Sequence, residues 1–167
     1  SFGYGASLTP ISLVSTYAML VNGGYHVSPK IIKNLETKKK RVFSENLSKD
    51  VRELLHNVVI NGSGKKAYVN GIDIGGKTGT ARKTNNKNYG DKVITSFIGV
   101  FPITKPKYII FILLDEPHKI NSEALYGGNT AAPIFSRILK RIAIDIKIYP
   151  EKKLEITKKK SLYNETF

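Results

Sequence analysis

The sequence contains no cysteine, which excludes disulfide bonds and thiolate metal sites. Its three histidines, His26, His56 and His118, lie far apart and lack the short spacing of metal-binding histidines. We therefore expect no metal ion, and no motif in the chain requires an organic cofactor. The absence of cysteine is compatible with an oxidising compartment.

Long hydrophobic stretches are also missing. The longest strongly apolar run covers residues 108–114 and is too short to cross a bilayer. Residues 1–5 have neither the charged region nor the apolar region of a signal peptide. The chain starts without methionine and in the middle of a motif, so we expect it to be part of a longer protein.

Acidic residues are scarce, with 13 Asp and Glu against 27 Lys and Arg, which gives a formal net charge of +14. A charge of this size is typical of proteins that bind nucleic-acid phosphates. However, 22 of the basic residues are lysines, and they are spread along the chain rather than gathered in one basic and aromatic segment. We interpret them as a solvated surface and expect no nucleic-acid partner. Attraction to an anionic polymer such as cell-wall material stays open.

The first part of the chain predicts two helices. Residues 9–22 have a capping residue, Thr9, followed by Pro10 at the first helical position, and two glycines follow at 23 and 24. A second helix is predicted from about Ser48, as the cap, to Asn61, with apolar residues spaced by three and four. Residues 29–43 between them are basic and polar, and we interpret them as a β-ribbon or excursion.

The second part predicts three strands, at 72–80, 96–101 and 108–114, joined by a polar connection at 82–92 and a proline-containing turn. The third strand is apolar at nearly every position, so we expect it to be covered on both faces. A final helix at about 133–144 has an apolar stripe for packing on the sheet, while Arg137, Lys140 and Arg141 point away. The order of elements predicts an α+β fold with an antiparallel sheet and flanking helices. We divide the chain into residues 1–149 and a basic, flexible tail, 150–167.

The segment Lys77-Thr78-Gly79-Thr80 carries the candidate chemistry. Gly79 has no side chain to block the backbone of an incoming acyl donor, and the N–H of Thr80 can point at a developing oxyanion. The hydroxyls of Thr78 and Thr80 can hold a substrate carboxylate. The charge of Lys77 favours an anionic substrate and a deprotonated neighbour. We predict Lys77 and Thr80 as catalytic and Thr78, Gly79 and Thr80 as substrate-binding, although the tetrapeptide alone fits an incidental surface hairpin equally well.

The neighbouring segments make this motif more specific, because they follow one another in the order that one known family shows. These segments are Ser1-Phe2-Gly3-Tyr4-Gly5 with Thr9-Pro10, residues 61–67, residues 75–81 with Lys83, residues 97–102, residues 112–117, Tyr126-Gly127-Gly128, and Ala132-Pro133-Ile134-Phe135. Together they resemble the C-terminal half of the transpeptidase domain of class B penicillin-binding proteins, with the cell-division peptidoglycan D,D-transpeptidase as the nearest match. The resemblance extends from Ser1 to about Ile144.

This resemblance implies part of the penicillin-binding-protein and serine β-lactamase fold, and a serine-type D,D-transpeptidase of septal cell-wall synthesis. In that family a serine attacks the penultimate D-Ala carbonyl, forms an acyl-enzyme and passes the acyl group to an amine. The implied ligands are the D-Ala-D-Ala stem peptide of peptidoglycan and β-lactam antibiotics, and the implied partners are cell-division proteins. The implied location is the periplasmic face of the bacterial inner membrane, through an N-terminal anchor that this chain does not contain.

The chain departs from the family pattern in its first two motifs. The family has S-x-x-K, then S-x-N, then K-T-G, whereas here Ser44-Glu45-Asn46 precedes Ser63-Gly64-Lys65-Lys66. With 12 serines and 22 lysines, about 1.6 strings of the form S-x-x-K are expected by chance. We therefore interpret neither string as catalytic and expect the nucleophile upstream of Ser1. On this interpretation the chain alone is inactive, and it exposes apolar surface that the missing part covers.

Two other functions stay open. One is a β-lactamase or penicillin-sensor domain of the same fold, which deacylation would distinguish. The other is a non-catalytic, penicillin-binding-like module, which the upstream sequence would distinguish. The sequence also leaves open a division or an elongation role, the amine acceptor and the oligomeric state.

Overall fold

The computed structural model describes residues 8–32, 40–85, 88–118 and 124–148. In this part of the chain the elements are α1 (Pro10–Val21), α2 (Glu45–Ile60), the 3-10 helix η1 (Lys65–Ala67), β1 (Gly75–Asn85), β2 (Asn88–Phe101), β3 (Tyr108–Asp115) and α3 (Ala131–Ile142). The strands form one antiparallel sheet in the order β1-β2-β3. This confirms the α+β class with an antiparallel sheet and flanking helices.

The helix starts show how well the caps were predicted. In α1 the Thr9 hydroxyl accepts a hydrogen bond from the Ser12 N–H at 3.3 Å, as expected. The predicted start of α2 at Ser48 is wrong by one turn, because Ser44 is the cap and accepts from the Leu47 N–H at 3.1 Å. Ser48 is buried instead, and its hydroxyl accepts from the Gly23 N–H at 2.9 Å, which joins α2 to the end of α1. Ser44 and Ser48 both have the chemistry of a cap, and only the packing of α2 on α1 distinguishes them.

The strands also differ from the prediction. β1 begins at Gly75 rather than residue 72, and both β1 and β2 extend through most of the polar segment 82–92. Their backbones pair as far as Asn85 with Asn88, so the predicted connection is mostly strand. Backbone pairing does not require apolar side chains, which is why the polar composition was misleading. For the predicted ribbon at 29–43, one bridge joins Tyr25 to Arg41, and residues 33–39 lie outside the described residues.

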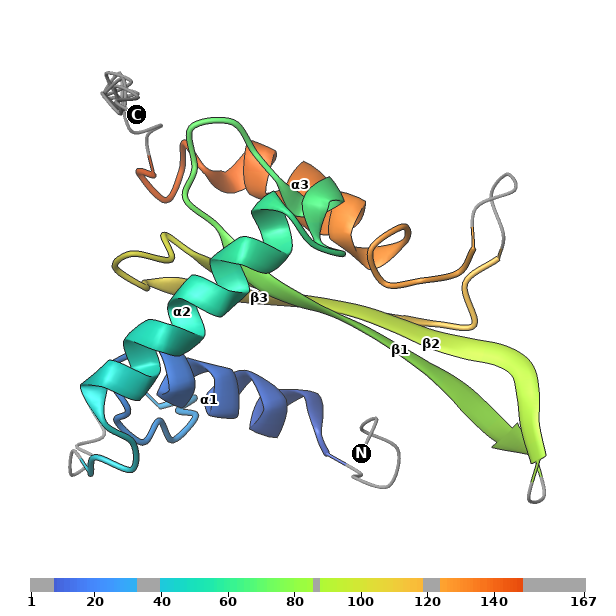
Figure 1. Cartoon of the computed structure of the whole chain (residues 1–167), viewed down its shortest axis with the longest axis horizontal. Helices are drawn as coiled ribbons and strands as arrows, with labels where there is room; N and C mark the ends of the chain where they lie inside the picture. The colour runs from blue at the N-terminus through green and yellow to red at the C-terminus, as the bar shows by residue number, and fades with distance from the viewer. Residues whose placement is uncertain (1–7, 33–39, 86–87, 119–123, 149–167) are drawn as a thin grey trace, which may run out of the picture.

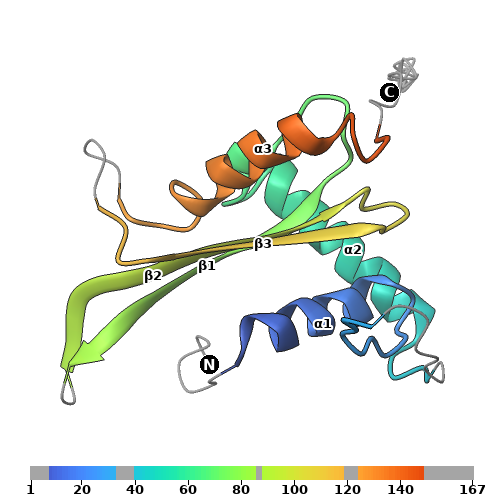
Figure 2. The ribbon, with the colours of Figure 1, turned by 180° about the vertical axis from the view of Figure 1, so that it is seen from behind.

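Helices cover both faces of the sheet, with α3 on one face and α1 on the other (Figures 1 and 2). On the α3 face, Phe97 and Phe101 of β2 pack against Phe135, with ring centroids 5.0 Å and 5.8 Å apart. A Cβ on Gly99 would lie 2.2 Å from the Phe135 ring, so only glycine lets α3 approach this closely. On the opposite face a smaller cluster joins α1 and α2 to the sheet through Val21, Leu55, Val100 and Ile103.

The last helix, α3, runs from Ala131 to Ile142, two residues earlier at each end than predicted. Phe135 and Leu139 are buried, whereas Arg137, Lys140 and Arg141 are exposed, as the stripe predicted. Helices contact β3 on both faces, as expected, but the cover is partial, because no β3 side chain is fully buried and Leu113 is 48% exposed. On the α1 face, α1 contacts β3 but leaves part of the strand exposed.

Apolar side chains remain exposed on the helices as well, notably Leu8 just before α1, Ile11 on α1 and Leu54 on α2. This agrees with the expectation that the chain by itself exposes apolar surface. Within the described ranges, no helix has the length and apolar character needed to cross a bilayer. The predicted tail, 150–167, and the motif at residues 1–5 lie outside the described residues.

Candidate active site at the edge of the sheet

The motif Lys77 to Thr80 lies on β1, which pairs only with β2 among the described residues and is therefore an edge strand. Gly79 is paired with Ser96, and Thr80 with Thr95. Because side chains alternate along a strand, Thr78 and Thr80 share the α3 face, while Lys77 and Gly79 share the opposite face. An edge strand leaves backbone groups open to an extended peptide, as the predicted substrate wall requires.

On the α3 face, two segments distant in sequence reach the motif hydroxyls. The Ser63 hydroxyl lies 2.8 Å from the Thr78 hydroxyl, and the backbone N–H of Gly127 donates to the Thr80 hydroxyl at 3.0 Å. Ser63 belongs to the turn after α2, and Gly127 belongs to the Tyr126-Gly127-Gly128 segment before α3. The structure thus places the hydroxyls of Ser63 and Thr78 in contact beside the exposed Thr80.

The two glycines before α3 allow this loop to lie directly on the strand. A Cβ on Gly127 would lie 2.3 Å from the Ser96 carbonyl oxygen and 2.5 Å from that of Gly79. A Cβ on Gly128 would lie 2.2 Å from the Ser63 carbonyl oxygen. The loop is also held by Thr130, whose hydroxyl lies 2.7 Å from that of the buried Thr95. The tight contact explains why two consecutive glycines occur at this point.

On the opposite face, Lys77 is exposed, and its ammonium donates to the Thr78 carbonyl oxygen at 2.9 Å. The side chain borders a hollow of about 370 Å³ whose other walls come from the C-terminal half of α2 and the following turn, namely Leu54, Leu55, Asn57, Val58, Asn61 and Gly62. Helix C-termini carry partial negative charge, which favours a cation at this position. Lys77 is therefore available to a ligand approaching the edge.

The packing of β1 on β2 gives a second reason why glycine occupies position 79. A Cβ at this position would lie 2.4 Å from the Ser96 hydroxyl oxygen, on the same face of the sheet. The predicted reason was access for an incoming backbone, and the structure adds that Ser96 of β2 needs this space. Both reasons favour glycine at position 79.

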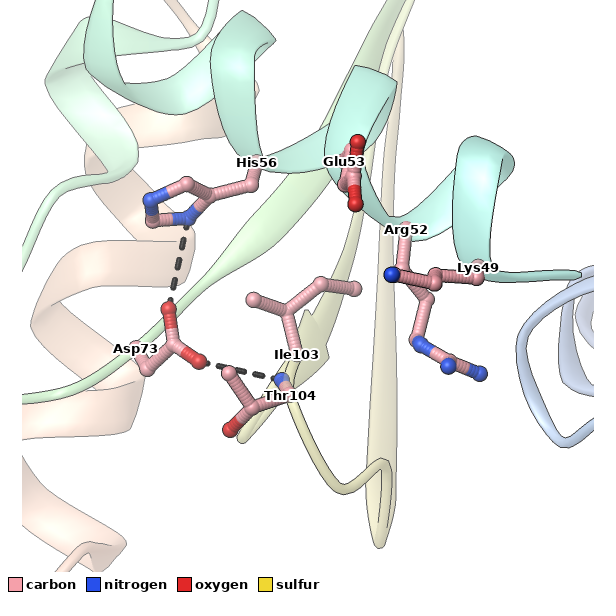
Figure 3. Close-up of a pocket in the computed structure, with 7 residues that line it drawn as sticks. All are labelled: Lys49, Arg52, Glu53, His56, Asp73, Ile103 and Thr104. Atoms are coloured by element: carbon pink, nitrogen blue, oxygen red, sulfur yellow. Dashed lines mark hydrogen bonds and ion pairs between the residues drawn. The ribbon is translucent and has the colours of Figure 1, made fainter. Parts of the chain in front are cut away.

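The backbone that leads into β1 is tied to α2 and to the β2–β3 turn (Figure 3). The carboxylate of Asp73 accepts from the Thr104 N–H at 3.0 Å and lies 3.3 Å from His56 Nδ1. His56 Nδ1 also lies 3.0 Å from the Ile74 carbonyl oxygen, which can only accept, so this nitrogen carries a proton. These groups border a hollow of about 270 Å³ on the flank of α2. Asp73 and His56 thereby position the start of the strand that carries Lys77.

Sequence reasoning missed Ser63 as part of this site. The prediction considered Ser63 only as a nucleophile and rejected it, whereas the structure places its hydroxyl in the wall beside Thr78. The available signal was the Asn61-Gly62-Ser63-Gly64 turn, whose glycines indicate a close approach of backbones. Ser44, the other rejected serine, is the cap of α2. In the described ranges, no group of three or more His, Asp or Glu side chains is placed to hold a metal ion.

The comparisons with known proteins identify the family. The family model for the penicillin binding protein transpeptidase domain matches residues 1–140, so the chain belongs to this family. A peptidoglycan D,D-transpeptidase FtsI homolog of Mesostigma viride is 34% identical over 90% of the chain, and stage V sporulation protein D of Bacillus subtilis is 36% identical over 99%. The chain spans 29% and 27% of these two relatives.

Two solved structures have a similar fold. The transpeptidase domain of penicillin-binding protein 3 from Burkholderia pseudomallei matches with a TM-score of 0.77 and 29% identity, covering 90% of this chain and 46% of that one. Penicillin-binding protein 3 from Mycobacterium tuberculosis, complexed with ampicillin, matches with a TM-score of 0.78 and 27% identity, covering 92% and 38%. The fold is therefore that of part of a penicillin-binding transpeptidase domain.

Proposed function

We propose that this chain supplies the substrate-binding wall of a serine-type peptidoglycan D,D-transpeptidase of septal cell-wall synthesis. The observation that carries the proposal is the edge strand β1, where Lys77 lies on one face and the hydroxyls of Ser63, Thr78 and Thr80 gather at the other. We place the nucleophilic serine in the part of the family's domain that this chain does not span. The chain by itself is then inactive.

In the proposed reaction the serine oxygen attacks the penultimate D-Ala carbonyl of a stem peptide. The carbonyl oxygen becomes an oxyanion, to which the Thr80 N–H donates, and the terminal D-Ala leaves with a proton as the acyl-enzyme forms. An amine then attacks the acyl-enzyme and releases the serine. The hydroxyls of Thr78 and Thr80 bind the substrate carboxylate, and the ammonium of Lys77 stabilises the negative charge of the site.

We infer that β-lactams occupy the same wall, because they also carry a carboxylate beside a reactive carbonyl. The ampicillin complex of the Mycobacterium tuberculosis protein supports this inference. We further propose cell-division proteins as partners and the periplasmic face of the inner membrane as the location. These two proposals rest on the resemblance to the cell-division transpeptidases, and one relative is instead named for sporulation.

Fluorescent penicillin tests the proposal. The complete protein, in which this chain is joined to the rest of the transpeptidase domain, should be labelled covalently, whereas the isolated chain should not. Labelling of the isolated chain at Ser63 would contradict the proposed division of the site. Rapid release of the label as penicilloate would favour a β-lactamase, and complete protein that binds reversibly without covalent labelling would favour a non-catalytic module.

A further inference from the structure

Lys83 lies where the three-stranded sheet ends and a two-stranded ribbon begins. Asp115, the last residue of β3, pairs with Ile94, which in turn pairs with Ala81 of β1. Among the described residues, only β1 and β2 continue beyond this level, and in Figures 1 and 2 they extend away from the helices. A two-stranded ribbon is marginally stable by itself, so its base needs an anchor.

The backbone pairing of β1 is irregular at this point. The register is continuous from Gly75 to Arg82 and shifts between Arg82 and Thr84, so that Lys83 has no partner in the ladder. Between the pairs that Arg82 and Thr84 form, β1 has one unpaired residue, Lys83, whereas β2 has three, residues 90–92, so the bulge lies in β2 opposite Lys83 and increases the local twist of the ribbon at this level. Thr80 lies only three residues before Lys83. Its hydroxyl accepts a hydrogen bond from the Gly127 N–H, and its own backbone N–H is the predicted oxyanion donor.

Although Lys83 has no backbone partner in the ladder, its side chain forms ion pairs at the end of β3. Its ammonium donates to Asp115 Oδ1 at 2.6 Å and to Glu116 Oε1 at 2.8 Å, and so crosses β2 to reach the end of β3. Glu116 is held in turn by its backbone N–H, which donates to the Val93 carbonyl oxygen at 3.0 Å. The side chain of Lys83 is 31% exposed and those of Asp115 and Glu116 are 59% and 37% exposed, so the pairs remain in contact with water and their role is to fix geometry rather than to add much stability.

Lys92 provides an internal comparison. Its ammonium lies 2.8 Å from Glu116 Oε2, so it contacts the same carboxylate as Lys83. However, Lys92 belongs to β2, which is the central strand, and its side chain is 63% exposed. Removal of Lys92 therefore weakens the ion cluster while leaving β1 tied to β3 through Lys83.

We propose that Lys83 is a positioning residue of the transpeptidase, which ties β1 at the base of the ribbon to the end of β3 and so holds Gly79 and Thr80 in place for the reacting carbonyl. This inference rests on the proposed function. On this proposal Lys83 contributes to the reaction although its side chain contacts neither the substrate nor the residues of the substrate-binding wall. Small displacements of positioned groups are costly in catalysis, since misplacement by about 1 Å can reduce a rate by about a hundredfold.

The test measures acylation of the complete protein by a fluorescent penicillin, with the acylation step and the prior binding step resolved by stopped flow. Lys83→Ala should slow the acylation step about tenfold or more, with a smaller change in binding. Lys83→Arg, which keeps two-acceptor binding, should stay within about threefold of the wild type. Lys92→Ala should stay within about twofold, because β1 remains anchored. Thermal unfolding of each variant sets a common temperature at which all are folded.

The outcomes separate this inference from the proposed function. A wild type that is not labelled refutes both. A labelled wild type with an unchanged Lys83→Ala acylation step refutes the inference alone, as does an equal loss in Lys92→Ala. If Lys83→Ala does not fold, the double variant Asp115→Asn with Glu116→Gln removes the acceptors instead. Its acylation step should then slow to a similar extent, and wild-type acylation in it would overturn the inference.

Discussion

The hydroxyl of Ser63 lies 2.8 Å from the hydroxyl of Thr78, although the two residues are 15 positions apart in the sequence. Ser63 is held there by the turn after α2, whose backbone lies against Gly128. Hydrogen bonding between the two hydroxyls restricts the rotation of Thr78, so that one face of the substrate wall is preorganised. A group that is oriented before the substrate arrives costs less free energy to use in the transition state.

Replacing Ser63 by alanine should slow β-lactam acylation of the complete protein by about two- to tenfold. This range corresponds to the loss of one neutral hydrogen bond, about 0.5–1.5 kcal/mol. The second-order acylation constant measures the effect. Ser63→Thr keeps the hydroxyl and should remain close to the wild type, so equal losses in both variants would contradict a role of the hydroxyl.

Replacing Lys77 by alanine should have the larger effect, with acylation slowed by about 10²–10³-fold, because a positive charge in the reacting site is lost. Lys107→Ala is the matched control, since it removes one exposed lysine from the β2–β3 turn and changes the net charge equally. Unchanged acylation of the Lys77 variant would mean that Lys77 has no part in the reaction.

Replacing Gly127 by alanine should destabilise the fold by about 1–3 kcal/mol, because the new methyl group would overlap two backbone carbonyl oxygens that cannot move freely. Chemical denaturation of the complete protein measures the change. Tyr126→Phe alters the neighbouring side chain, which is 62% exposed, and should stay within about 0.5 kcal/mol of the wild type. An equally stable Gly127→Ala variant would show that the loop can lift away from β1.

Acid should weaken the ion cluster at the ribbon base through Glu116. Hydrogen bonds from Lys83, and then from Lys92, lower the pKa of Glu116 from 4.5 to about 2. A carboxyl group whose pKa is depressed by folding contributes stability above its unfolded pKa, and this contribution is lost as the pH falls from about 4.5 to about 2. Glu116→Gln should therefore flatten the dependence of stability on pH across this window, measured by thermal unfolding at several pH values. Glu53→Gln, at an exposed position on α2, is the control, and identical acid profiles for the two variants would contradict the role of Glu116.

Local signals in the sequence were sufficient for the helices. Thr9 and Pro10 define the start of α1, and the apolar stripe of α3 identifies Phe135 and Leu139 as buried. They were insufficient where two nearby residues had the same capping chemistry, as for Ser44 and Ser48, and where polar residues continued a strand. The ribbon formed by residues 82–85 and 88–92 illustrates the second case, since its pairing depends on the opposite strand rather than on its own composition.

By itself, the sequence determined the family, the α+β class and the strand that carries Lys77 to Thr80, because these follow from motif order and from hydrophobic periodicity along the chain. Only the tertiary structure decided that β1 is an edge strand, that Ser63 and Gly127 meet its hydroxyls, and that Lys83 reaches the end of β3. These contacts join residues separated by 15 to 47 positions, and no local pattern specifies which distant partner a hydroxyl or an ammonium will meet. Packing of the loops on the sheet decides it.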